Sequence, residues 1–396
     1  MRRIHQIEVE NFKSLVAFTV ELPKFSCLIG LNGSGKSTVL QFIDFLAQLV
    51  RGDMKGWLGE RRWKPADLKS KLTKKVNLEF TIHFSDGNGE PAGRWEATYS
   101  PTKNRCIRER IDLLDFVLQA NGEEIEALSV KGPTPKGWKN WKSPITFSYE
   151  GSILSALKEE LLPPSIRDCK AFLAEVKSLD LLAPERLRQR TRESSGTLGL
   201  GGENLSAFLH EMSDQKRLKL IDMLKRAYPQ LQGLHAKSLR SGWKQLEIRE
   251  SYENPQLGFL PMMTTDARHI NDGLLRLIAI LAELQSEHRF LLFDEIENGI
   301  NPELVEFVLE ALVTSPKQIM VTTHSPMILN YLDDDTARQG VIYLYKTRGG
   351  ETRAIPFFTI PSLKKKLEVM GPGEAFVDTN LTELAAEIAG LAKEEP

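Results

Sequence analysis

Eight consecutive residues near the start of the chain have the types and spacing of a phosphate-binding loop. Residues 30–37 read Gly-Leu-Asn-Gly-Ser-Gly-Lys-Ser, between a short apolar run and a helix-forming stretch. Glycines let backbone N–H groups turn inward around phosphate oxygens, and the first turn of the helix adds partial positive charge. Lys36 supplies a full charge, and the Ser37 hydroxyl is a suitable Mg²⁺ ligand. An ordinary glycine-rich turn is the alternative, which the flanking strand and helix disfavour. The residues predicted to line this site are Asn32, Gly33, Ser34, Gly35, Lys36, Ser37 and Thr38.

Two acidic residues end a second apolar run late in the chain. Residues 290–295 read Phe-Leu-Leu-Phe-Asp-Glu. If 290–293 is a strand of a parallel sheet, Asp294 and Glu295 lie at the carboxyl edge, where the phosphate loop also opens. We expect Asp294 to hold the metal and Glu295 to act as the general base that polarises an attacking water. A strand that simply ends in solvated acids is the alternative.

A histidine follows the next predicted strand, in the segment Thr-Thr-His-Ser-Pro at 322–326. A lone histidine after a strand is more often structural than catalytic. The position of His324 at the strand end that follows Glu295 favours a functional role. We expect it to form a hydrogen bond with the terminal phosphate.

Length and composition indicate a large soluble globular protein. The 396 residues exceed a usual single domain, so one large domain with an inserted lobe, or two domains, is expected. Apolar residues make up 41% and charged residues 27% of the chain, which excludes wholesale disorder. The three cysteines are far apart, and no apolar run is long enough to span a bilayer, so we expect a cytoplasmic protein without a membrane partner.

Charge is nearly balanced, with 52 Lys and Arg against 53 Asp and Glu, so no general basic field marks a dedicated nucleic-acid binder. Two local features leave DNA binding open. Residues 51–75 are basic and contain Trp57 and Trp63, and four arginines recur at 186, 188, 190 and 192. These could line a nucleic-acid groove, or they could be the solvated faces of an exposed insertion and a helix.

The hydrophobic patterns predict an α/β fold: a β-rich N-terminal lobe and a mostly parallel sheet flanked by helices, with an inserted helical lobe. Strands are expected through residue 29 and between 76 and 148, including 145–149, and a helix over 36–50. Helical spacing prevails over 152–227, including 172–182. Strands follow at 246–249, 256–260, 290–293 and 318–322, with helices at 273–286, 303–314, after Pro326 and from Pro361. The predicted domain ranges are 1–150, with 51–75 as an exposed basic insertion, 151–231 for the helical lobe, 232–360, and 361–396 for a helical tail.

The combined motifs resemble the RecF/SMC-type branch of the ABC ATPases. The resemblance rests on the phosphate loop, the preceding segment Val-Glu-Asn-Phe-Lys-Ser-Leu at 9–15, the acidic pair at 294–295 and the Thr-Thr-His-Ser segment. The pattern is similar, more closely, to stand-alone ATPases related to the overcoming-lysogenization-defect proteins and to the Septu anti-phage ATPase subunit. The family carries a Ser-Asp-Gly-Thr-type signature at a helix start, where this chain has Asn271, Asp272 and Gly273. The serine is absent, although Asn271 can still cap the helix.

The resemblance implies ATP and Mg²⁺ as ligands, ATP hydrolysis, and a homodimer that holds two ATP molecules between the phosphate loop of one subunit and the signature of the other. The segment 299–302 matches the family's loop between protomers. Two functions remain: a nucleotide-gated switch in anti-phage defence that acts with an effector protein, such as a nuclease or toxin, encoded nearby, or a RecF-like ATPase that clamps DNA in repair or recombination. A GTPase would need Asn-Lys-x-Asp and a transporter motor a fuller signature, and the sequence has neither. Nuclease activity within this chain is not expected, because the residues after His324 lack an acidic cluster like that of a metal-dependent cleavage site.

Overall fold

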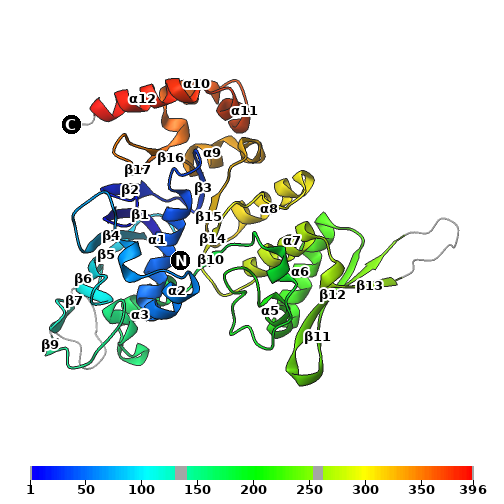
Figure 1. The fold of residues 1–396 in the computed structure, drawn as a ribbon, viewed down its shortest axis with the longest axis horizontal. Helices are drawn as coiled ribbons and strands as arrows, with labels where there is room; N and C mark the ends of the chain where they lie inside the picture. The colour runs from blue at the N-terminus through cyan, green and yellow to red at the C-terminus, as the bar shows by residue number, and fades with distance from the viewer. Residues whose placement is uncertain (1, 130–140, 253–261, 395–396) are drawn as a thin grey trace. The chain divides into compact units, whose positions relative to one another are not determined.

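The computed structural model describes residues 2–129, 141–252 and 262–394 (Figure 1). The protein is a mixed α/β molecule, as predicted. Its contacts divide the chain into two compact units, Met1–Lys177 with Arg338–Lys364, and Ser178–Ala337 with Lys365–Pro396. The first break therefore lies after residue 177, whereas the ranges predicted from sequence place breaks at 150 and 231.

The first unit contains an eight-stranded antiparallel sheet in the order β2-β1-β4-β5-β6-β7-β8-β9. Alternate side chains are buried along these strands, as expected for a sheet with one covered face. Helix α1 (Lys36–Arg51) covers that face, where Phe42 contacts Phe80 and Phe45 contacts Tyr99. The strands are β1 (Arg3–Glu10), β2 (Phe18–Glu21), β4 (Leu78–Ser85), β5 (Pro91–Ser100), β6 (Arg105–Leu113), β7 (Phe116–Ala120), β8 (Glu124–Ser129) and β9 (Trp141–Pro144).

The strand predicted at 145–149 is wrong. Strand β9 ends at Pro144, and the chain then leaves the sheet. Tyr149 instead covers the core, where its hydroxyl donates to Cys106 O at 3.0 Å. The sequence also predicts a glycine- and proline-rich turn at 132–137, which lies outside the described residues.

Strands β3 (Phe25–Ile29), β16 (Val341–Lys346) and β17 (Thr352–Pro356) also belong to the first unit. Strand β3 pairs in parallel with β16, and β16 pairs antiparallel with β17. The sequence patterns had not indicated β16 or β17. The unit also holds α2 (Met54–Glu60), α3 (Pro164–Ala174) and the short 3-10 helices at Pro65–Leu68, Ile153–Ser155, Glu159–Leu161 and Phe357–Thr359.

The prediction that 51–75 is an exposed insertion is wrong in part. Helix α2 buries Met54, Trp57 and Leu58 against the unit. Trp57 Nε1 donates to Asp44 Oδ2 at 2.7 Å, and Arg61 pairs with the same carboxylate at 2.5 Å. Apolar burial and a buried charge pair therefore attach this segment to α1. Its lysines at 55, 64, 69, 71, 74 and 75 remain exposed.

The second unit contains the parallel pair β14 (Phe290–Phe293) and β15 (Gln318–Thr322) and a three-stranded antiparallel sheet in the order β11-β12-β13. The strands and helices predicted at 246–249, 273–286, 290–293, 303–314 and 318–322 are confirmed. The antiparallel strands are β11 (Leu231–Ser238), β12 (Lys244–Ser251) and β13 (Met262–Asp266); the helices are α4 (Pro184–Leu187), α5 (Leu205–Glu211), α6 (Asp214–Ala227), α7 (Asp272–Leu284), α8 (Pro302–Thr314), α9 (Asp334–Gly340), α10 (Pro361–Lys366, at the boundary of the units), α11 (Pro372–Val377) and α12 (Leu381–Glu394).

Two further predictions need correction. Residues 172–182 are not one helix, because α3 ends at Ala174 and β10 (Val176–Leu179) follows. Leu179 O accepts a hydrogen bond from Asp294 N at 3.3 Å, a sheet contact that overrides the local helical spacing. After Pro326 the chain forms only a 3-10 helix, Pro326–Tyr331, and the strand predicted at 256–260 lies outside the described residues. Within the described ranges, no helix is long and apolar enough to cross a membrane.

Candidate functional site

The glycine-rich loop between β3 and α1 needs its glycines for two reasons. Gly30, Gly33 and Gly35 have φ angles of 142°, 78° and 112°, which residues with side chains rarely adopt. A Cβ atom on Gly30 would lie 2.2 Å from Leu344 O, and one on Gly35 would lie 2.4 Å from Thr352 Oγ1. Both the turn and the close approach of β16 and β17 therefore require glycine.

Several polar groups of this loop are left for an outside partner. Helix α1 has Gly35 as its N-cap and no side-chain cap, which leaves N–H groups of its first turn unsatisfied. Ser34 Oγ is buried without a hydrogen-bond partner among the described residues. The backbone N–H groups of Gly33 and Gly35 have no hydrogen-bond acceptor among the described residues either. Phosphate oxygens accept hydrogen bonds from all of these groups, so the residues present fit a phosphate ligand.

The charged and hydroxyl groups of the loop differ in burial. Lys36 is buried, and its Nζ donates to Gly30 O at 2.8 Å, so the ammonium is folded onto the loop. Ser37 is exposed on the first turn of α1, and Thr38 is half-buried next to it. Asn32 is exposed at the loop tip. These side chains form the phosphate half of the candidate site, in the first unit.

Asp294 and Glu295 follow β14 in the second unit. Phe293 lies opposite Val321 in the parallel pair, which brings Thr322 beside the acidic residues. Thr322 Oγ1 donates to Asp294 Oδ1 at 2.5 Å and accepts from Glu295 N at 2.8 Å. One buried hydroxyl therefore fixes the carboxylate of the first acid and the backbone of the second.

Glu295 has a strained backbone and a carboxylate held by two side chains. Its φ of 47° lies in the left-handed region, which is unfavourable for a residue with a side chain. Its Oε1 lies 3.4 Å from His324 Nε2, and its Oε2 accepts from Asn298 Nδ2 at 3.2 Å. Strain of this kind persists where surrounding contacts impose it, and it occurs often at functional sites. The predicted pair of Glu295 and His324 is therefore brought together.

Two residues that the sequence patterns did not single out hold this acidic turn. Glu297 Oε1 accepts from His324 N at 2.8 Å and from Ser325 N at 3.2 Å, which fixes the histidine backbone. Arg276, on α7, is buried, and its guanidinium donates to the carbonyl oxygens of Asp294, Glu295 and Asn298. Burial lowers the pKa of Arg276 to about 10, against the opposite effect of nearby carboxylates led by Glu297. The available signal for Arg276 was a basic residue within the apolar run from Leu274 to Leu284.

The predicted signature residues begin α7. Asn271 is the N-cap, and its Oδ1 accepts from Leu274 N at 2.8 Å, which leaves its exposed amide nitrogen free to donate. Asp272 pairs with Arg188, which also donates to Ile270 O at 2.8 Å. A Cβ atom on Gly273 would lie 2.9 Å from Gly299 O. The signature and the segment 299–302 are therefore neighbours within the second unit. Asn301 caps α8 through its position only, because its side chain makes no cap hydrogen bond.

Two family models match the chain in the regions that hold these residues. The model described as "AAA ATPase domain" matches residues 2–126, which include the phosphate loop. The model described as "AAA domain, putative AbiEii toxin, Type IV TA system" matches residues 264–330, which include Asn271, Asp294, Glu295 and His324. A search of curated protein sequences gave no match.

Solved structures of SMC head domains share the fold. An SMC head bound to the C-winged helix domain of ScpA has a TM-score of 0.51 and 15% identity over 89% of this chain and 97% of that chain. An SMC head with an extended coiled coil, bound to the C-terminal domain of ScpA derived from Pyrococcus furiosus, has a TM-score of 0.51 and 14% identity over 93% and 98%. An SMC head from Thermotoga maritima aligns with a TM-score of 0.45 and 12% identity over 89% and 98%.

The chain therefore has the fold of an SMC head, and two of its segments match family models of AAA-type ATPase domains. This confirms the predicted fold class. The closer resemblance to the overcoming-lysogenization-defect and Septu proteins stays a prediction.

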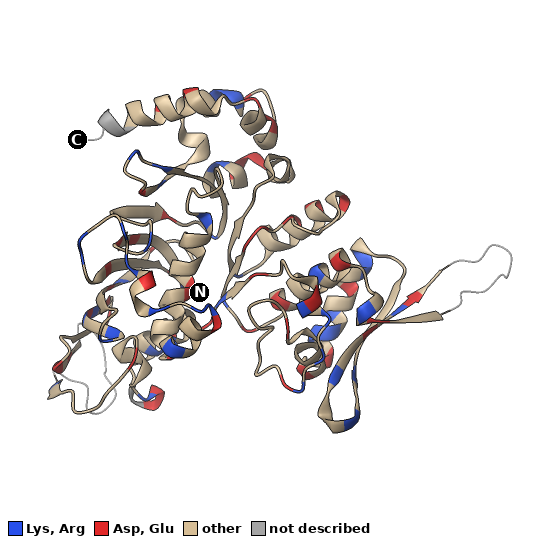
Figure 2. Cartoon of the chain, viewed as in Figure 1, with Lys and Arg blue, Asp and Glu red and all other residues tan. Residues whose placement is uncertain are grey.

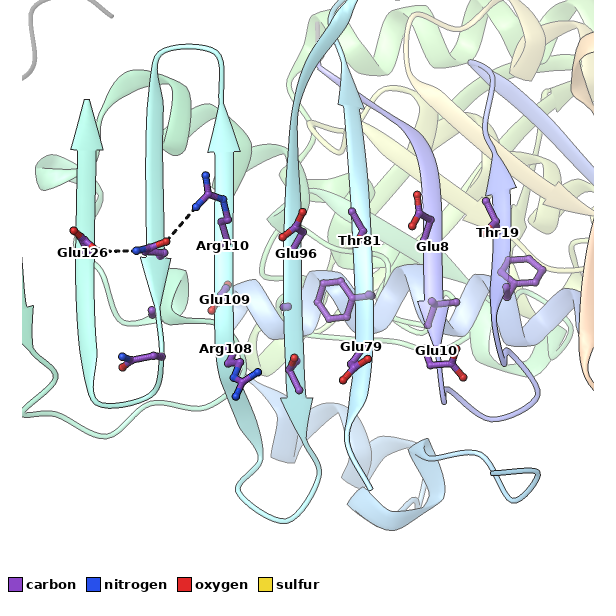
Figure 3. Close-up of a pocket in the computed structure, with 18 of the residues that line it drawn as sticks. Glu8, Glu10, Thr19, Glu79, Thr81, Glu96, Arg108, Glu109, Arg110 and Glu126 are labelled. Carbon is purple, nitrogen blue, oxygen red and sulfur yellow. Dashed lines mark hydrogen bonds between the residues drawn. The ribbon is translucent and has the colours of Figure 1, made fainter. Parts of the chain in front are cut away.

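The outer face of the eight-stranded sheet carries a separate hollow of about 720 Å³ (Figure 3). Glutamates at 8, 10, 79 and 96 lie on its β1, β4 and β5 side, and Arg108 and Arg110 extend from β6. Glu10 and Glu79 lie directly opposite each other on neighbouring strands. Such a surface repels phosphate groups, so the acidic side of this hollow suits neither a nucleotide triphosphate nor a nucleic-acid backbone.

The basic features that left DNA binding open are partly engaged within the protein. Trp57 is 3% exposed, and Trp63 packs edge-on against it with Lys13 Nζ 3.3 Å from the Trp63 ring centroid. The hypothesis that this stretch lines a nucleic-acid groove is therefore wrong for Trp57, whose side chain is buried. The arginine run is also paired: Arg186 with Glu203, Arg188 with Asp272, Arg190 with Asp266, and Arg192 with the ring of Trp243. Lys and Arg alternate with Asp and Glu along both units (Figure 2).

Proposed function

We propose that this protein binds ATP with Mg²⁺ and hydrolyses it. The observation that carries the proposal is the unsatisfied phosphate loop, in which the buried Ser34 Oγ and the N–H groups of Gly33 and Gly35 have no partner among the described residues. In the proposed complex, the loop and the acidic turn at 294–295 face the same triphosphate. The family model of an AAA ATPase domain that matches residues 2–126, and the AAA domain model that matches residues 264–330, support the two halves of this proposal.

Each polar side chain has a distinct task in the proposed reaction. Lys36 and the loop N–H groups bind the phosphate oxygens, and Ser37 and Asp294 hold the metal. When bound, Mg²⁺ neutralises charge on the phosphates. Glu295 orients a water molecule in line with the terminal phosphorus and accepts its proton. His324, 3.4 Å from Glu295, donates to an oxygen of that phosphate. Thr322 and Arg276 keep the two acidic residues in place.

The test separates binding from turnover. Lys36→Ala is expected to weaken ATP binding by at least tenfold, because it removes a charge from the phosphate cradle. Glu295→Gln keeps the size of the side chain but cannot accept the proton, so turnover is expected to fall by about 10²-fold or more with binding retained. Calorimetric titration with a non-hydrolysable ATP analogue and a phosphate-release assay measure the two quantities. A wild-type chain that takes up no nucleotide refutes the proposal.

We further propose that the ATPase is a nucleotide-gated switch of anti-phage defence in the cytoplasm, acting with an effector, a nuclease or toxin, encoded in trans. Two findings support this. The second family model is described by a toxin of a toxin–antitoxin system, and the matched SMC heads are bound to a separate protein, ScpA. Co-expression with the product of the adjacent open reading frame tests it. Retention of that product, and its release on ATP addition or hydrolysis, is the expected result, and purification of this chain alone contradicts it.

The alternative is a RecF-like ATPase that clamps DNA. The exposed lysines between 55 and 75 favour it, because a run of solvated cations suits a phosphate backbone. Saturating duplex or single-stranded DNA should then stimulate ATP turnover. Charge reversal of Lys69, Lys71 and Lys74 should remove the stimulation while leaving basal turnover intact. Unchanged turnover and mobility with DNA would leave the defence switch as the better proposal.

A further inference from the structure

Three segments of the first unit that are distant in sequence meet at one buried hydroxyl. Thr352, the first residue of β17, is fully buried. Its Oγ1 lies 2.8 Å from Ser14 Oγ, 2.9 Å from Ser34 O and 3.0 Å from Lys346 Nζ. Its backbone N–H also donates to Ser14 O at 2.8 Å. The contact with Ser34 places the β16–β17 hairpin against the phosphate loop.

The chemistry of the partners fixes the direction of each hydrogen bond. A hydroxyl has one proton to donate and two lone pairs that accept. A carbonyl oxygen only accepts, so Thr352 Oγ1 donates to Ser34 O. A lysine ammonium only donates, so Lys346 Nζ donates to Thr352 Oγ1. The remaining lone pair then accepts from Ser14 Oγ. The proton and both lone pairs of the Thr352 hydroxyl are therefore used, and the three hydrogen bonds can form in only one set of directions.

This arrangement orients an amide of the phosphate loop. In a planar trans peptide, the C=O and the N–H point in opposite directions. The bond from Thr352 holds the carbonyl of Ser34 toward the hairpin, so the N–H of Gly35 points away from it. That N–H has no partner within the described residues. The Gly35 conformation, at φ 112°, is one that a free glycine loop could easily leave.

We propose that Thr352 is a positioning residue for the bound triphosphate, through the peptide between Ser34 and Gly35. The inference rests on the proposed function, since the N–H of Gly35 is taken to donate to phosphate. Ser14 and Lys346 act through Thr352. They donate to both lone pairs of its hydroxyl oxygen, which leaves the hydroxyl proton directed at Ser34 O. Ser34 and Thr352 are far apart in the sequence, so a motif confined to the loop cannot predict this contact.

The test compares three variants of the full chain. Thr352→Val keeps the shape and removes the hydroxyl, and it is expected to weaken binding of a non-hydrolysable MgATP analogue about tenfold. Thr352→Ser keeps the hydroxyl and removes a buried methyl group, so the melting temperature should fall while affinity stays within about twofold. Thr352→Cys supplies only a weak hydrogen-bond donor, and its affinity for the analogue should fall about threefold or more. It replaces Thr352→Val in the test if that variant does not fold.

Hydrogen exchange of the peptide spanning residues 30–38, in nucleotide-free protein, gives a second readout. It should be faster in Thr352→Val than in wild type and unchanged in Thr352→Ser. Equal affinity and equal exchange in wild type and Thr352→Val would overturn the inference, as would an equal loss of affinity in Thr352→Ser. If wild type binds no nucleotide, the proposed function fails, whereas the exchange rates still decide whether Thr352 holds the loop.

Discussion

At the scale of single residues, the ionised carboxylate of Glu109 destabilises the folded protein. Glu109, on β6, is 4% exposed. Trp95 Nε1 and Ile153 N each donate to it at 2.9 Å, and Ser152 Oγ also bonds to it. Burial raises the pKa of this carboxyl from 4.5 to about 7, and the three hydrogen bonds only partly oppose the shift. The native protein therefore holds this proton more tightly than the unfolded chain.

Stability should consequently fall as pH rises through this window. Because the folded pKa is the higher one, the stabilisation by the bound proton is complete below about pH 4.5 and is lost as pH passes about 7. The expected change is roughly 2–3 kcal/mol in the free energy of unfolding. Glu109→Gln does not titrate, so the stability of wild type should fall relative to that of the variant from pH 5 to pH 8.

Denaturant titrations at several pH values measure this difference. Glu79→Gln on the same sheet is the matched control, because Glu79 is exposed, and it should keep the wild-type pH dependence. A constant gap between wild type and Glu109→Gln over this range would show that Glu109 does not bind the proton.

At the scale of elements, Asp44 joins α1 to the segment that follows it. Its carboxylate is 4% exposed and accepts from Trp57 Nε1 and Arg61. Asp44→Ala leaves the Arg61 charge and the indole N–H without this partner, and we expect a loss of about 3–5 kcal/mol in the free energy of unfolding. Asp53→Ala, which removes only the cap of α2, should cost about 1 kcal/mol. Chemical denaturation compares them, and similar small losses would contradict the role given to Asp44.

The same scale explains what the sequence predicted. The continuous apolar runs Phe25–Ile29 and Phe290–Phe293 are buried strands, and each ends next to the first residue of a motif. The apolar pattern and the motif therefore predicted the same strand ends. Helix α7 begins at Asp272 with Asn271 as its N-cap, which agrees with the capping role predicted for Asn271. Strand β10 has only four residues, which is too short to show an alternating hydrophobic pattern. It forms because it pairs with the chain beside Asp294. Local pattern cannot foresee such pairing.

The supporting residues of the site escaped prediction for a related reason. Thr322 belongs to the segment 322–326 that the sequence singles out, but only the parallel register of β14 and β15 places its hydroxyl between Asp294 and Glu295. Thr352 makes its contact across most of the chain. Motifs identify groups that touch a ligand, whereas the residues that hold those groups depend on tertiary contacts.

At the scale of the whole molecule, the predicted site residues are distributed over both compact units. The phosphate loop belongs to the first, and Asn271, Asp294, Glu295 and His324 belong to the second. In the homodimer that the resemblance implies, the signature of one subunit reaches the nucleotide of the other. The start of α7 suits that role, because its N–H groups and the free amide of Asn271 favour a phosphate. Dimerisation should then depend on an intact terminal phosphate.

The decisive variant for the dimer is Glu295→Gln, because it should retain ATP without cleaving it. With ATP and Mg²⁺, light scattering should give the mass of two chains for this variant and a shorter-lived dimer for wild type. Adding Lys36→Ala to Glu295→Gln should restore the mass of one chain, since no nucleotide bridges the subunits. Asn271→Ser, which preserves the N-cap, should still dimerise, whereas Asn271→Ala should lose about 1 kcal/mol of helix capping together with the amide donor. If the mass stays that of a single chain at saturating ATP, hydrolysis would have to be coupled to motion within one chain, and the clamp would be wrong.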